Sequence, residues 1–119
     1  MESLRKFKHD LRTPVNHILG YSELLLEAAS DAGDGRLADF AKCIHDNGKK
    51  LATLMEKNLP SSAAPGGMLS DTFRADIRAI AKQILGILTD GSGMAGIDLY
   101  ADDLGRIRDA ANQLIVLIG

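Results

Sequence analysis

Four residues near the start of the sequence combine side chains that can do chemistry together. His9, Asp10, Arg12 and Thr13 supply an imidazole, a carboxylate, a guanidinium and a hydroxyl. Each residue of a helix advances by about 100°, which places His9 roughly opposite the apolar positions on either side of it. We therefore predict a solvent-facing arc of one helix that carries all four groups.

Such an arc permits nucleophilic chemistry on phosphorus. An imidazole that is neutral near pH 7 can attack a phosphoryl group. The adjacent carboxylate of Asp10 can hold the other N–H of the ring, and the hydroxyl of Thr13 can position a water for the reverse hydrolysis. Pro14 removes one backbone hydrogen bond and crowds the preceding turn, so we expect the helix to bend or loosen just after His9.

The composition excludes several other classes of function. The 119 residues fit one domain, with 14 basic and 16 acidic side chains and a net charge of -2. That balance argues against nucleic-acid binding through a broad basic surface. Aromatic residues make up 4% with no Trp, so base-stacking platforms are not expected. Hydrophobic residues make up 45%, which is enough for a packed core.

The sequence also indicates a compartment. Cys43 is the single cysteine, so no internal disulfide can form and a reducing environment is indicated. The longest apolar run, 114–118, is far shorter than the roughly 20 residues of a membrane span. The first residues lack an apolar stretch of the signal-peptide type. We expect a soluble, cytoplasmic, helix-rich domain with no membrane insertion.

Apolar residues recur at alternating steps of three and four in four segments, the pattern of packed amphipathic helices. The segments run over about 3–29, 36–59, 70–89 and 98–118, separated by glycine-rich turns at 30–35 and 90–96 and a Pro/Gly/Ser linker at 60–69. The expected seam of the first helix comprises Leu4, Phe7, Leu11, Pro14/Val15, Ile18, Tyr21 and Leu25. In the second helix, Asn47 and Gly48 interrupt the apolar stripe, so we expect unusual packing there.

Two helical hairpins can bury their apolar stripes only against each other. We therefore predict an all-α fold, an antiparallel four-helix bundle made of hairpins at 1–59 and 70–119. A chain of this length can close such a core without a partner.

The two hairpins look like copies of one another. At an offset of 66 positions, Phe7 to Gly20 aligns with Phe73 to Gly86 with six of fourteen residues identical. The second helices align at an offset of 63, which pairs Ile44 with Ile107. We interpret this as a tandem repeat whose second copy is degenerate, since Ala75 and Ala79 stand where the first copy has His9 and Thr13.

The run FKHDLRTPVN, residues 7–16, resembles the H-box of the dimerisation and histidine-phosphotransfer (HisKA/DHp) domain of sensor histidine kinases. The segment 18–25 and the leucine stripe Leu51, Leu54 and Leu59 are also typical of that family. The resemblance covers residues 4 to about 59, and the second half through the repeat.

The resemblance implies roles for individual residues. His9 corresponds to the phosphoacceptor and Asp10 to the acid/base that assists it. Thr13 corresponds to the position that orients water when such domains dephosphorylate a response regulator. Pro14 corresponds to the proline that bends the helix, and Arg12 to a structural position. The implied partners are a kinase ATP-binding domain and a receiver domain whose aspartate takes the phosphoryl group.

The sequence departs from the family in two ways. The second hairpin lies in the same chain, which favours a monomeric pseudo-dimeric DHp-like bundle and leaves a homodimer open. No Asp-x-Gly-x-Gly box follows, so we expect a separate domain to bind ATP and this chain to hold no cofactor. The chain is then either a fragment of a longer histidine protein kinase or a module that other chains phosphorylate, and whether it is itself an enzyme stays open.

The sequence is also compatible with a second interpretation. The bundle could be a non-catalytic signal relay or scaffold attached to an output domain, with His9 vestigial. A metal site from His9, His17, His45 and Cys43 is not expected, because their spacing gives no sign of convergence. We expect His17 to be a half-buried polar residue.

Overall fold

The structure is a computed structural model that describes residues 2–58, 71–94 and 96–118. Four long helices account for most of these residues: α1 (Glu2–Ala32), α2 (Gly35–Asn58), α3 (Asp71–Gly91) and α4 (Ala101–Ile118). A short 3-10 helix, η1 (Ile97–Tyr100), precedes α4, and the described part of the chain contains no strand. The predicted all-α fold is confirmed.

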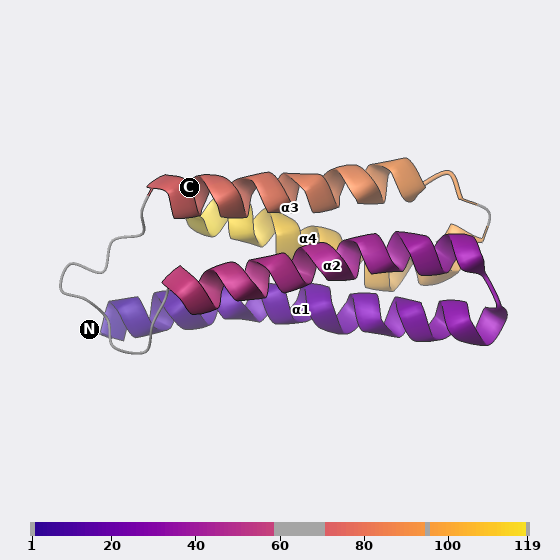
Figure 1. The fold of residues 1–119 in the computed structure, drawn as a ribbon, viewed down its shortest axis with the longest axis horizontal. Helices are drawn as coiled ribbons and strands as arrows, with labels where there is room; N and C mark the ends of the chain where they lie inside the picture. The colour runs from indigo at the N-terminus through magenta and orange to yellow at the C-terminus, as the bar shows by residue number, and fades with distance from the viewer. Residues whose placement is uncertain (1, 59–70, 95, 119) are drawn as a thin grey trace.

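The helices form one antiparallel bundle with an extent of 50 × 22 × 19 Å (Figure 1). Helix α1 packs against α2 and α4, and α3 packs against α4 and α2. Each helix therefore has one neighbour from its own hairpin and one from the other hairpin. The predicted packing of two hairpins against each other is confirmed.

One continuous core runs along the bundle axis. Helix α1 buries Leu11, Val15, Ile18, Ser22, Leu25 and Ala29. The seam therefore passes through Ser22, and the prediction of Tyr21 at this step was wrong, since Tyr21 is half-buried at its edge. A tyrosine at the rim can bury its ring and keep its hydroxyl near water. The side chains of Leu4 and Phe7 lie outside the described residues.

The other three helices bury matching stripes. The buried positions of α2 are Leu37, Phe40, Ala41, Ile44, Asn47, Gly48, Leu51 and Met55. Those of α3 and α4 include Phe73, Ile77, Ala81, Ile84, Ile107, Ala110, Ala111, Leu114 and Ile118. Leu54, expected on the stripe, is half-buried at its edge. At Gly48 the packing is close, because an added Cβ would stand 3.0 Å from Cδ2 of Leu19 and 3.2 Å from Cγ2 of Ile18.

The turn between α1 and α2 is shorter than the predicted segment 30–35. Gly33 adopts a left-handed conformation with φ of 65°, and the N–H of Asp34 donates to the carbonyl of Ala29 at 2.9 Å. This is the Schellman arrangement that ends many helices. Asp34 then caps α2, since its Oδ1 accepts a hydrogen bond from the N–H of Leu37 at 3.1 Å.

The second connection places the start of the last helix differently from the prediction. Gly96 has φ of 78° and leads directly into η1, so the segment predicted as the first turn of an α-helix at Asp98 is a 3-10 turn. The side chain of Ile97 is buried and fixes this turn on the core. The predicted linker at 60–69 lies outside the described residues, and the domain boundaries there stay predictions.

None of the helices in the described ranges is long and apolar enough to cross a membrane.

Candidate functional site

His9 lies in the first third of α1, toward the end of the bundle that carries the N-terminus (Figure 1). Its side chain is exposed, whereas Leu11 two positions on is fully buried. The helical period alone predicts that His9 and Leu11 point to opposite sides of α1, and the predicted exposure of His9 is confirmed. The imidazole can therefore be reached by another protein without any opening of the core.

Asp10, Arg12 and Thr13 complete the polar arc on the same helix. Arg12 is exposed, while Asp10 and Thr13 are half-buried along its edges. The Oγ1 atom of Thr13 donates a hydrogen bond to the carbonyl oxygen of His9 at 3.0 Å. Because this bond uses the hydroxyl proton, the lone pairs of Oγ1 are left to accept a hydrogen bond from outside the helix.

One expected contact is not seen. Among the described side chains, the carboxylate of Asp10 makes no hydrogen bond to the ring of His9. Adjacent residues on a helix diverge by about 100° and do not face each other, so the carboxylate cannot easily fix the ring tautomer from this position. Asp10 can therefore interact with the imidazole only when the ring turns toward the carboxylate.

Helix α1 continues through Pro14 without interruption, and the ring of Pro14 is buried. A proline has no N–H, so the carbonyl of Asp10 lacks its usual helical donor at this step. The helix bend expected here stays a prediction.

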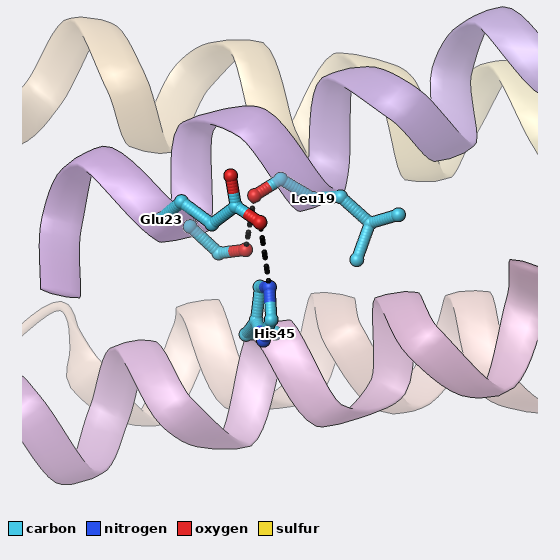
Figure 2. A network of polar contacts seen from close by, with 4 residues as sticks. Leu19, Glu23 and His45 are labelled. Atoms are coloured by element: carbon cyan, nitrogen blue, oxygen red, sulfur yellow. Dashed lines mark hydrogen bonds and ion pairs between the residues drawn. The ribbon is translucent and has the colours of Figure 1, made fainter.

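Two contacts between helices were not foreseen. The Nε2 atom of His45 on α2 lies 3.2 Å from Oε1 of Glu23 on α1 (Figure 2). Within α1 itself, the buried hydroxyl of Ser22 donates to the carbonyl of Leu19 at 3.0 Å. Pairs of this kind depend on the register between two helices, which no pattern within either helix reveals.

The second contact joins α1 to α4. The Cζ atom of Arg106 lies 5.6 Å from the ring centroid of Tyr21, a cation–π geometry. The ring of His17 meets the same tyrosine edge-on, with centroids 6.1 Å apart and ring planes at 71°. His17 is exposed, so the expectation of a half-buried residue was wrong.

On the far side of the bundle, a shallow groove of about 480 Å³ lies between α2 and α3. Its lining is Lys49, Lys50, Thr53, Leu54, Asp76, Ala79 and Ile80. The last three align, at the 66-residue offset, with Asp10, Thr13 and Pro14 of the polar arc. Within the described ranges, no group of three or more His, Cys, Asp or Glu side chains could hold a metal ion.

Comparison with known proteins identifies the family. Residues 2–62, slightly more than half of the chain, match the His Kinase A (phospho-acceptor) domain. The chain is 29% identical over 103 residues to the Non-motile and phage-resistance protein of Caulobacter vibrioides, covering 85% of this chain and 12% of that protein. It is 29% identical over 97 residues to Histidine kinase 2 of Arabidopsis thaliana, covering 81% of this chain and 8% of that protein.

A third relative is the Circadian input-output histidine kinase CikA of Synechococcus elongatus, 30% identical over 102 residues, which are 85% of this chain and 14% of that protein. The chain thus spans about a tenth of the length of the curated relatives that it matches. None of the known solved structures matches it significantly. With its helical bundle, its histidine kinase relatives and the match over residues 2–62, the chain belongs to the His Kinase A (phospho-acceptor) domain family.

Proposed function

We propose that the chain is the phosphoacceptor and phosphotransfer module of a cytoplasmic two-component signalling system, with His9 as the residue that carries the phosphoryl group. The observation that carries the proposal is the exposed imidazole of His9 on the outer face of a phospho-acceptor family bundle, at the start of the sequence His-Asp-Leu-Arg-Thr-Pro.

The reaction has two steps. A ring nitrogen of His9 attacks the γ-phosphorus of ATP held by a separate kinase domain, an N–P bond forms and ADP leaves. A carboxylate oxygen of a receiver-domain aspartate then attacks the same phosphorus, and the N–P bond breaks to regenerate the imidazole. This chain supplies the nucleophile, and the partner domains supply the nucleotide and the final acceptor.

Two neighbours of His9 assist in different ways. The carboxylate of Asp10 accepts a proton from the imidazole as the N–P bond forms, and it does so as the ring turns toward an incoming phosphoryl group. The hydroxyl of Thr13 donates its hydrogen bond to the carbonyl of His9. Its Oγ1 atom can therefore accept a hydrogen bond from the water that hydrolyses a phosphorylated receiver.

We further propose that the second hairpin takes the place of a second protomer. Positions paired by the repeat are buried alike: Leu11 with Ile77, and Ile44 with Ile107, are each fully buried. Ala75, the counterpart of His9, is exposed but cannot accept a phosphoryl group. This supports a monomeric bundle of 12.7 kDa with one phosphoryl group per chain.

The test is phosphoryl transfer with labelled phosphate. The protein is incubated with labelled ATP and the ATP-binding domains of several histidine kinases, and acid-labile label on the protein is measured. We expect label on the wild type, none on His9→Gln, and full label on His17→Gln, which removes another exposed histidine of α1. Label that persists in His9→Gln, or a wild type that no kinase domain labels, contradicts the proposal and favours a non-catalytic relay bundle.

Light scattering at micromolar concentration tests the second part of the proposal. A mass near 12.7 kDa supports the single-chain bundle, and twice that mass contradicts it.

A further inference from the structure

We infer that the groove between α2 and α3 is a binding site for a small organic anion with an apolar body, such as a medium-chain carboxylic acid. Helices α2 and α3 run side by side, one from each hairpin (Figure 1). No residue of α1 lines the groove, so it is separate from the polar arc that holds His9. The inference therefore does not depend on phosphoryl transfer.

The groove has the dimensions of a small-molecule site. Its volume of about 480 Å³ falls within the range of about 300–1,000 Å³ that is typical of such sites. Its lining residues fall within 49–54 of α2 and 76–80 of α3, so the groove extends along only about 8 Å of helix axis. A protein partner covers roughly 800 Å² of each surface, and a docked helix places its anchors over about two turns or more. These dimensions favour a compact ligand.

Apolar side chains form the floor of the groove. Leu54 of α2 and Ile80 of α3 are half-buried at the edge of the core, and Ala79 adds only a methyl group. At the 66-residue offset, Thr13 stands at the position of Ala79, so this groove carries a methyl group where the polar arc carries a hydroxyl. The apolar body of a ligand would remove this floor from water, which favours binding.

Positive charge lies along one wall of the groove. Lys49 and Lys50 of α2 line it, and both side chains are exposed. Thr53 follows Lys49 by four residues, which places its hydroxyl one turn further along the same side of the helix. Ammonium and hydroxyl groups arranged in this way can all donate hydrogen bonds to one carboxylate or sulfonate. An anionic head group would therefore lie against α2, with its apolar body against α3.

The charges of the groove select a ligand with one negative charge. Asp46 precedes Lys50 by four residues and Asp76 lies on the opposite wall, yet no carboxylate of the described residues is within ion-pair distance of Lys49 or Lys50. The lining holds two ammonium groups and one carboxylate, so a monoanion balances its charge. Repulsion by Asp76 also disfavours a head group placed against α3.

The experiment uses the whole, unphosphorylated chain and the fluorescent probe 8-anilinonaphthalene-1-sulfonate, which has one anionic group on an apolar body. Displacement of the probe gives the dissociation constants of octanoate and of octan-1-ol, which has the same chain length and no charge. We expect one probe molecule per chain and displacement by octanoate. Circular dichroism confirms that each variant is folded, because partly folded proteins also bind this probe.

Two pairs of variants test the two parts of the site. Lys49→Ala/Lys50→Ala should raise the dissociation constant of octanoate about fivefold or more and leave that of octan-1-ol unchanged. Its matched control is Lys42→Ala/Lys82→Ala, which removes two exposed lysines outside the groove and should match the wild type.

Ala79→Leu should weaken the binding of the probe and of both competitors about tenfold, because the larger side chain fills the groove. Ala75→Leu makes the same change one turn earlier on α3, at an exposed position outside the lining, and should have no effect.

Several outcomes overturn the inference. They are a wild type that does not bind the probe, more than one probe molecule per chain, and equal effects of Ala79→Leu and Ala75→Leu. A loss of octan-1-ol binding as large as that of octanoate in the double lysine variant also overturns it. So does flotation of the protein with phosphatidylglycerol vesicles that depends on Lys49 and Lys50, since these lysines would then face a membrane. None of these measurements involves a phosphoryl group, so their failure leaves the proposed role of His9 intact.

Discussion

The aromatic ring of Phe40 on α2 lies against the backbone of Gly91 at the end of α3. A Cβ built on Gly91 would stand 2.7 Å from Cζ and 2.8 Å from Cδ1 of that ring. Real Cβ atoms do not approach other atoms so closely, and Phe40 is only 8% exposed in a close-packed core. Gly91 therefore lets the two hairpins meet at this end of the bundle.

This contact predicts opposite effects for two glycines of α3. Gly91→Ala should lower the free energy of unfolding by about 1–3 kcal/mol, because the ring of Phe40 has to shift. Gly86→Ala should raise it by about 0.5–1 kcal/mol, because Gly86 is exposed in the helix with no atom near its missing Cβ. Urea unfolding followed by circular dichroism measures both. A free energy of unfolding that does not fall in Gly91→Ala would contradict the packing at Gly91.

Asn47 provides a second test of the core. It is 7% exposed, and its Oδ1 has no partner in the described part of the chain, while its Nδ2 donates to the carbonyl of Cys43 at 2.8 Å. That carbonyl lies within the helix and keeps its backbone donor, so the side-chain bond adds little. Asn47→Ala should raise the free energy of unfolding by about 1 kcal/mol, because the buried acceptor is removed.

The control for this variant is Asn112→Ala, at an exposed position of α4. It makes the same chemical change and should alter stability by only a few tenths of a kcal/mol through helix propensity. If Asn47→Ala destabilises the protein, a water or another partner satisfies Oδ1 and the polar group supports the fold.

Periodicity within a helix was enough to predict much of this architecture. The steps of three and four predicted the four helices and the burial of Leu11, Ile18 and Ile44, and the 100° advance predicted the exposure of His9. The seam error at Tyr21 has a physical origin. Ser22 is polar and Tyr21 is large and partly apolar, so residue type alone favours Tyr21 as the buried position. Packing against the other helices decides which of the two is buried.

Contacts between helices could not be predicted in the same way. The pair of His45 with Glu23 and the stacking of Arg106 on Tyr21 depend on how far one helix is shifted along another. The proposed roles of His9, Asp10 and Thr13 rest on residue chemistry and on the family resemblance. Measurements of phosphoryl transfer test them.

Asp10 is the first of these residues to test. Asp10→Asn should slow the labelling of His9 by about 10²–10⁴-fold, the range that a positioned acid or base contributes. Asp76→Asn is the matched control, since Asp76 occupies the corresponding position of α3 but has Ala75 beside it. The initial rate of label incorporation should be unchanged in this control. Comparable rates for Asp10→Asn and the wild type would remove Asp10 from the mechanism.

Substitution of Thr13 should affect the dephosphorylation of a receiver and not the labelling of His9. Thr13→Ala should leave the labelling of His9 within about twofold and reduce the dephosphorylation of a receiver by about tenfold or more, because the water loses the acceptor that orients it. Thr13→Ser keeps the hydroxyl and should retain most of the dephosphorylation. The rate of dephosphorylation is measured as the release of inorganic phosphate from a labelled receiver.

The structure also offers a matched threonine for this test. The Oγ1 atom of Thr89 on α3 donates to the carbonyl of Leu85 at 3.0 Å, the same bond that Thr13 makes to His9. Thr89→Ala removes that bond far along the sequence from the polar arc, so it reports any effect of the hydroxyl on the helix alone. If Thr89→Ala slows dephosphorylation as much as Thr13→Ala, the effect comes from helix stability and Thr13 has no part in positioning the water.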